Sequence, residues 1–204
     1  ISVLRTLIIS MNEIVTQTPK VDALIKPIQE RLATWDRPVI TAYELGVLVT
    51  SQLGTDPITA SLLNDVLRTL LSFGLISPAK DFKPSTVFHL FGRVKPQATE
   101  VACSIDPFAY VSHLSAMEYH GITDRFSKIL YLSIPPDREW KELADVRMDK
   151  DLKSNKESYL AKKLPALKFQ KFDRIDGVRV ELMRRSHRGA FTVSYTHLTL
   201  PTKA

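Results

Sequence analysis

The 204-residue sequence predicts an α+β fold, and three observations carry this prediction. Apolar residues recur at helical spacing in three stretches before residue 75. Two short strand-like runs separated by a polar, proline-containing stretch follow them. Beyond about residue 102, helix-like and strand-like stretches are mixed. The order predicts an N-terminal winged helix-turn-helix followed by a mixed α/β C-terminal domain.

The first helix is predicted over residues 21–35, where Leu24, Ile28 and Leu32 form an apolar stripe. Asp36-Arg37-Pro38 breaks it, and residues 39–40 have the composition of a very short strand. Thr41 stands three residues before Glu44, the spacing of a capping box that opens a second helix.

A third helix is predicted after Thr59, which has the side chain of an N-cap residue. It ends at Phe73-Gly74, and strands are predicted at residues 75–76 and 87–91. Three helices followed by a hairpin is the order of a winged helix-turn-helix, which we place over residues 11–94. A linker is predicted over 95–101 and the C-terminal domain over 102–192.

In a helix-turn-helix, the second helix lies in the major groove and presents polar side chains to the base edges. The polar face of the third predicted helix carries Ser61, Asn64 and Arg68. Arg68 matches guanine and Asn64 matches adenine in bidentate pairing. Lys80 and Lys83, between the two strands, are candidates for phosphate contacts.

The net charge of +6 suggests a polyanionic partner, but it is unevenly distributed. Residues 147–190 hold 13 Lys/Arg and 6 Asp/Glu, whereas residues 21–94 hold 7 of each. Arg179, Arg184 and Arg185 lie on or just after a predicted strand, residues 178–183, and are further candidates for DNA contact. A basic sheet face and an ordinary solvated surface both remain open for this region.

Residues 110–121 predict a short capped helix. Asp106-Pro107 would supply an N-cap oxygen and a proline in the first turn, and Gly121 would end the helix in the left-handed conformation. A strand is predicted next over residues 128–134, then a helix over 137–148. Residues 167–172 and 178–183 alternate as strands around the hairpin signal Asp176-Gly177.

The predicted capped helix contains Ser112, Ser115, Ala116, His120 and Gly121 in the pattern Ser-x-x-Ser-Ala-x-x-x-His-Gly. This pattern before a strand resembles the signature of the AbiEi antitoxin family, transcriptional regulators of type IV toxin–antitoxin systems of abortive infection and phage defence. The likeness is specific around residues 110–124 and generic over the rest of 11–192.

The resemblance implies a DNA-binding autorepressor that recognises inverted repeats of duplex DNA in its own promoter. It also implies antagonism of an AbiEii-type nucleotidyltransferase toxin without a stable complex. The signature helix itself has two interpretations: its small residues allow close packing, or its polar face binds a partner or DNA.

Residues 193–204 resemble translated sequencing-adapter read-through. We therefore expect a non-native tail after residue 192 and an incomplete C-terminal domain.

Enzyme activity is not expected, and the sequence indicates no cofactor or metal. There is no Gly-x-Ser-x-Gly elbow, Walker loop or paired zinc motif. His113 and His120 are seven residues apart and would share one face of a regular helix. A metal would need a third ligand, for which Asp124 or Cys103 is a candidate, but packing or capping explains this spacing better. A helical His113 would point away from Ser112.

Cys103 is the only cysteine, which fits a reducing cytoplasm and a small buried side chain without activation. The apolar residues 1–10 are fewer than the roughly 20 that a membrane span needs, so no membrane association is expected. The alternative to a DNA-binding protein is an interaction module whose winged helix is a protein-docking surface. The neutral residues 21–94 favour it, and the basic C-terminal half disfavours it.

Overall fold

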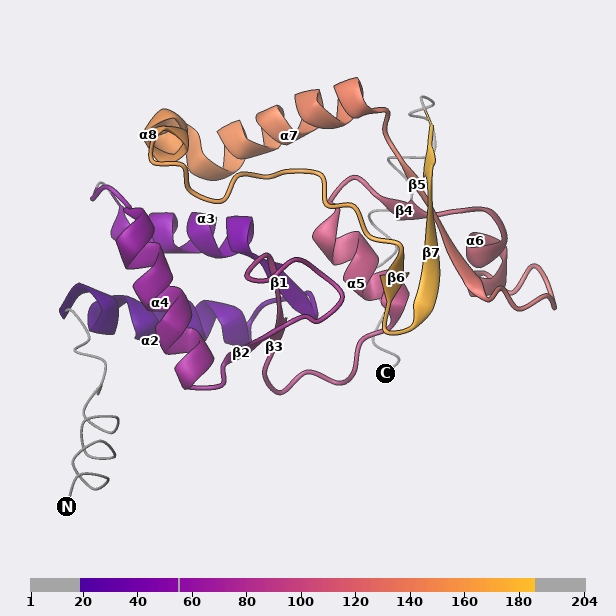
Figure 1. Cartoon of the computed structure of the whole chain (residues 1–204), viewed down its shortest axis with the longest axis horizontal. Helices are drawn as coiled ribbons and strands as arrows, with labels where there is room; N and C mark the ends of the chain where they lie inside the picture. The colour runs from indigo at the N-terminus through magenta and orange to yellow at the C-terminus, as the bar shows by residue number, and fades with distance from the viewer. Residues whose placement is uncertain (1–18, 55, 186–204) are drawn as a thin grey trace, which may run out of the picture.

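A computed structural model describes residues 19–54 and 56–185 as helices packed around two small sheets (Figure 1). The elements follow in this order: α2 (Pro19–Ala33), β1 (Val39–Thr41), α3 (Ala42–Leu53), α4 (Ala60–Ser72), β2 (Ile76–Pro78), β3 (Val87–Leu90), α5 (Ala98–Ile105), β4 (Tyr110–Val111), α6 (His113–Tyr119), β5 (Ile129–Ile134), α7 (Asp137–Leu152), the 3₁₀ turn η1 (Lys153–Asn155), α8 (Lys156–Ala161), β6 (Arg174–Ile175) and β7 (Val178–Arg184). The mixed α+β class predicted from the sequence is confirmed. Residues 11–18 and 186–192 of the predicted domains, and the predicted tail, lie outside the described residues.

The first sheet has the order β1-β3-β2 and is antiparallel throughout. It lies between two cores because its side chains alternate. Ile40 and Phe88 join the helices α2, α3 and α4 in the first core, while Val39 and Val87 join α5 in the second.

The second sheet has the order β4-β5-β7-β6, with β5 and β7 parallel and the other neighbours antiparallel. Its inner face packs Leu132 and Val180 against α5 in the second core. Asp176 and Gly177 have positive φ angles of 49° and 82° at the turn between β6 and β7, which confirms the predicted hairpin.

Local capping signals are confirmed at both helices of the pair α3 and α4. The Thr41 hydroxyl accepts from the Glu44 N–H at 3.2 Å, and the Glu44 carboxylate accepts from the Thr41 N–H at 2.9 Å. Thr59 caps α4 by accepting from the Leu62 N–H. These short-range bonds fix where each helix begins.

The prediction of one helix from Asp106-Pro107 to Gly121 is wrong for its first half, which is not helical. Asp106 ends α5, residues 110–111 pair with β5, and α6 begins only at His113. The Asp106 carboxylate instead accepts from the Phe108 N–H and from the Trp140 indole, a partner 34 residues away. A contact at that range leaves no local signal.

The strand predicted over residues 167–172 is also wrong, since the structure places no strand before Arg174 in that part of the chain. Leu167 and Phe169 pack against a cluster of Phe108, Trp140 and Ala144. The alternation in the sequence therefore reflects packing along α7 and not pairing in a sheet.

The predicted linker over 95–101 is helical from Ala98 onward, and it does not separate two independent cores. Helices α7 and α8 lie across the top of α3 in Figure 1, and Met148, Leu152 and Tyr159 belong to the first core. The Tyr43 hydroxyl of α3 also donates to Asp151 of α7 at 3.1 Å. The two halves of the described chain thus share buried surface.

Candidate nucleic-acid interface

Helix α4 presents the polar face that the sequence predicted. Leu63, Val66 and Leu70 are buried on its inner side, which anchors the helix against the first core. Ser61, Asn64, Arg68 and Ser72 are exposed on the outer side. The side chains proposed to contact bases are therefore accessible on a helix that is fixed from behind.

Arg68 forms an ion pair with Asp65, one helical turn earlier, at 3.6 Å. The Arg68 side chain is 65% exposed, so the pair contributes little to stability and leaves most guanidinium donors available. Asp65 also offsets the charge of Arg68, and α4 as described carries no other cation.

The connection between β2 and β3 carries the exposed side chains of Lys80 and Lys83. It is attached to the C-terminal half at two points. Asp81 accepts from the Asp176 N–H at 2.8 Å, and the Phe82 and Phe172 rings meet edge to face at 5.8 Å. The two lysines therefore sit on a fixed loop beside the β6–β7 hairpin.

The three C-terminal arginines predicted to contact DNA are in different situations. Arg184 pairs with Asp137 and stacks over the Phe169 ring, and Arg185 donates to His113. Arg179 is exposed, has no ion-pair partner among the described residues, and lies directly opposite Arg174 across the hairpin. Of these three arginines, Arg179 is the one whose guanidinium has no partner within the described part of the chain.

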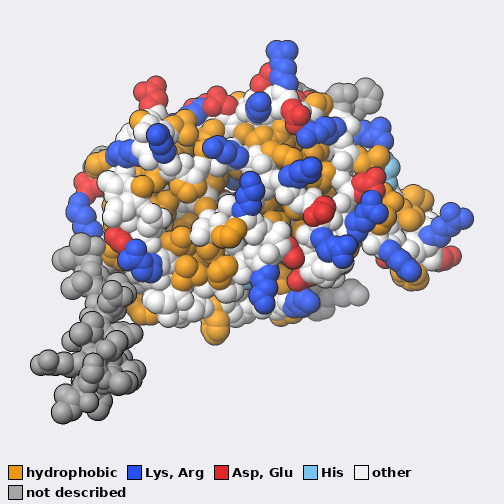
Figure 2. Space-filling model, in the orientation of Figure 1, with side chains coloured by type: hydrophobic (Ala, Val, Ile, Leu, Met, Phe, Trp, Pro, Cys, Tyr) orange, Lys and Arg blue, Asp and Glu red, His pale blue; other side chains and the backbone are white. Residues whose placement is uncertain are grey.

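The structure brings Lys80 and Lys83 close to the hairpin of Arg174 and Arg179 through the contact between Asp81 and Asp176. Acidic residues lie among them, including Asp173 and Glu181, which are exposed. Figure 2 accordingly shows Lys and Arg side chains scattered over this face with Asp and Glu between them. These Lys and Arg side chains are separated by acidic ones and do not form a continuous basic surface.

The signature helix α6 lies beside the first half of β5, which the two-residue strand β4 leaves unpaired. The Ser115 hydroxyl accepts from the Tyr131 N–H at 3.0 Å and donates to the Ile129 carbonyl at 3.1 Å, as a neighbouring strand would. The Ser112 N–H donates to the Tyr131 carbonyl at 3.0 Å. These two signature residues therefore have a structural role at the sheet edge.

The other signature residues shape the end of α6. Ala116 accepts from the His120 N–H, and Gly121 has a φ of 65°, the left-handed conformation that ends a helix. The exposed His120 ring meets Tyr119 edge to face. The helix end predicted at Gly121 is confirmed.

Ser112 and His113 are adjacent in space as well as in sequence, contrary to the expectation that they point apart. His113 has a φ of 52°, and its Nδ1 lies 2.8 Å from the Ser112 hydroxyl. Arg185 donates to the Nε2 atom of His113, because a guanidinium nitrogen can only donate. Nε2 is then the acceptor, Nδ1 carries the proton, and His113 is not placed as a base toward Ser112.

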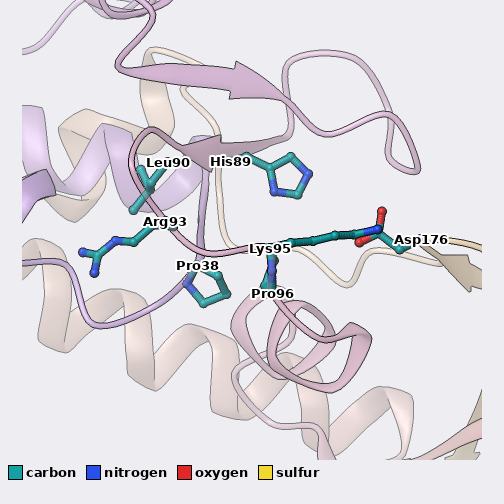
Figure 3. A pocket seen from close by; sticks show the side chains of 7 residues that line it. All are labelled: Pro38, His89, Leu90, Arg93, Lys95, Pro96 and Asp176. Atoms are coloured by element: carbon teal, nitrogen blue, oxygen red, sulfur yellow. The ribbon is translucent and has the colours of Figure 1, made fainter.

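A cavity of about 280 Å³ opens between the two sheets and was not predicted from the sequence (Figure 3). His89 of β3, Lys95 and Asp176 line it from three segments, and Figure 3 shows Lys95 extending across it toward Asp176. The Arg93 guanidinium turns away and donates to the carbonyls of Ala33 and Trp35. His89 is half-buried, and nothing in its sequence neighbourhood marked it as part of a cavity.

Two titratable groups with shifted pKa values, Cys103 and Asp106, lie at the end of α5. Burial raises the pKa of the Asp106 carboxyl above its usual value, although bonds from Phe108 and Trp140 oppose the shift. Burial, and then the negative charge of Asp106, raises the pKa of the Cys103 thiol to about 12. Cys103 is therefore a protonated thiol at neutral pH, and not an activated nucleophile.

Within residues 19–54 and 56–185, no three His, Cys, Asp or Glu side chains come together as a set of metal ligands. In the same part of the chain, no helix has the length and apolar character required to span a membrane. No protein-family model matches the chain, and neither a curated protein nor a solved structure matches it.

Proposed function

We propose that this chain is a DNA-binding protein whose N-terminal half is a winged helix-turn-helix with α4 as its recognition helix. One observation carries the proposal. The order α2-β1-α3-α4-β2-β3, with the strands arranged β1-β3-β2, packs the apolar side of α4 inward and leaves its polar side exposed. A helix presented in this way fits the major groove.

In the proposed complex, Asn64 and Arg68 read base edges and Ser61 contacts the backbone or a base at the start of the helix. Arg68 exchanges its exposed bond with Asp65 for a bidentate bond to guanine. Lys80, Lys83 and Arg179 bind phosphates, which positions the protein without selecting a sequence. Arg184 already pairs with Asp137, and Arg185 donates to His113. These two arginines therefore have a secondary role in DNA binding.

The resemblance of residues 110–121 to the AbiEi signature supports a more specific proposal. The chain would repress its own promoter at inverted repeats and act in the cytoplasm as the antitoxin of a type IV toxin–antitoxin system. Its counterpart would be an AbiEii-type nucleotidyltransferase, opposed without a stable complex. The C-terminal half would carry the antitoxin role, and the protein would not be an enzyme.

The proposal is tested by titrating the full chain against duplex DNA from upstream of its own gene and against a scrambled duplex, at two salt concentrations. Specific binding that weakens as salt rises is expected, because each neutralised phosphate releases counterions. Equal and weak binding to both duplexes would contradict a sequence-specific repressor.

A second candidate function, a protein-interaction module, is favoured by the charge of the N-terminal half. Residues 21–94 carry equal numbers of acidic and basic side chains, and Arg68 is already paired with Asp65. Phe73 and Phe91 are also 59% and 79% exposed just after α4 and β3. Such a module would show no salt-sensitive affinity for duplex DNA in the same titration.

A further inference from the structure

Helix α6 and the loop after it expose four large apolar side chains within ten residues. Met117, Tyr119, Ile122 and Phe126 are 43%, 50%, 69% and 84% exposed. No residue of α6 is buried. Monomeric proteins rarely expose large contiguous apolar patches, so a group of exposed apolar side chains on one segment is a candidate interaction site.

The loop is held in shape against the helix. The Ile122 N–H donates to the Met117 carbonyl at 2.8 Å, and the Ser127 N–H donates to the Glu118 carboxylate at 3.0 Å. This segment forms the projection at the right of Figure 1, where Figure 2 shows apolar side chains between charged ones. The exposed side chains therefore belong to a fixed surface.

The charges of this segment are balanced. Residues 117–128 contain two acidic side chains, Glu118 and Asp124, and two basic ones, Arg125 and Lys128. Asp124 and Arg125 are adjacent and exposed, and neither side chain has an ion-pair partner among the described residues. A neutral surface of this kind does not attract nucleic acid, whose binding depends on positive charge.

The way in which a partner would bind is also restricted. The edge of β5 beside α6 is already occupied by the hydroxyl of Ser115 and the N–H of Ser112. An added strand would have no free backbone groups there. The partner must contact side chains, and it must supply an apolar area with one acidic and one basic group.

A second copy of this chain meets that requirement. In an interface with two-fold symmetry, every contact between one residue and another is made twice, once from each copy. An acid and a base that are adjacent in one copy can therefore pair with the base and the acid of the second copy. We propose that the α6 surface (Met117, Tyr119, Ile122, Asp124, Arg125 and Phe126) joins two copies of the chain. Ile122 and Phe126 pack across the axis, and Asp124 of each copy pairs with Arg125 of the partner subunit. This inference does not depend on the proposed DNA binding.

The first test is the mass of the full chain in solution from micromolar to submillimolar concentration, by sedimentation equilibrium. A dimer is expected, and Ile122→Arg should weaken it more than about 10-fold by burying a charge in the apolar centre. Val146→Arg is the matched control, because Val146 is 66% exposed on α7, far from this surface in the sequence. The control should leave the dimer unchanged.

The second test uses the charges. Asp124→Arg and Arg125→Asp should each weaken the dimer by placing like charges together, and the double variant should restore it. An equal mixture of the two single variants should form mixed dimers, because their charges are then complementary. A chain that stays monomeric, or a dimer that Ile122→Arg and the charge exchanges leave intact, would overturn the proposal.

Discussion

Tyr159 of α8 lies against Gly46 of α3 so closely that a methyl group at position 46 would overlap the tyrosine hydroxyl. The hydroxyl cannot turn aside freely, because Tyr159 is fully buried and donates to the Pro165 carbonyl at 2.9 Å. This contact joins helices more than one hundred residues apart in the sequence. It shows that the C-terminal helices complete the N-terminal core.

Gly46→Ala should therefore destabilise the protein by about 2 kcal/mol, the cost typical of overpacking. The usual effect of this substitution inside a helix is the opposite, a gain of roughly 0.5–1 kcal/mol. Tyr159→Phe removes the overlapping oxygen, and the ring carbon then nearest to the new methyl group is 3.1 Å away. In a double-mutant cycle followed by urea unfolding, Gly46→Ala should cost less in the Phe background. Strictly additive effects would contradict the contact.

Asp106 should make stability depend on pH. Its folded-state pKa is raised by burial, so at a pH between the unfolded and folded values the folded protein holds a proton that the unfolded chain has lost. The stability that Asp106 contributes is complete below its unfolded pKa of about 4 and declines as pH rises through the higher folded value. Asp106→Asn cannot titrate, so the difference in unfolding free energy between wild type and variant should fall with rising pH. A difference that is constant or that rises with pH would contradict this environment.

Ser115→Ala should destabilise the fold by about 1–2 kcal/mol, because one backbone N–H is left without a hydrogen-bond acceptor. The Ile129 carbonyl keeps a second donor, the Ser127 hydroxyl, but the Tyr131 N–H loses its partner. Ser158→Ala is the control, since Ser158 is exposed on α8, and it should change stability by less than about 0.5 kcal/mol. Chemical denaturation measures both, and equal effects would argue against the role of Ser115 at the sheet edge.

Cys103 should react slowly with iodoacetamide in the folded protein. A pKa of about 12, compared with 9.0 for an ordinary thiol, leaves roughly a thousandth of the usual thiolate. Alkylation followed by mass spectrometry at pH 8 should be at least about 100-fold slower than in urea. A rate close to that of the unfolded chain would show that Cys103 is accessible and ionised.

The features predicted from the sequence rest on short-range chemistry. The capping box of Thr41 and Glu44, the turn at Asp176-Gly177 and the end of α6 at Gly121 each involve residues within a few positions of one another. The exposed face of α4 follows from helical periodicity. Signals of this kind can be recognised within a short stretch of sequence.

The features that were missed depend on distant partners. Asp106 is held by Trp140, so it ends α5 and does not begin a new helix. Ser115 has the spacing of a helical residue but acts as a strand neighbour to β5. The engagement of Arg184 and Arg185 by Asp137 and His113 is likewise visible only in three dimensions.

The most direct test of the proposed function compares two arginine variants in DNA binding. Arg68→Ala removes the base-reading side chain of α4, while Arg138→Ala removes an exposed, ion-paired arginine of α7. The quantity to measure is the ratio of affinities for the upstream and scrambled duplexes at fixed salt. If α4 reads the operator, Arg68→Ala lowers this ratio by about 1–3 kcal/mol, or about 5- to 150-fold, and Arg138→Ala leaves it unchanged. An unchanged ratio for Arg68→Ala, or equal losses in both variants, would contradict α4 as the recognition helix.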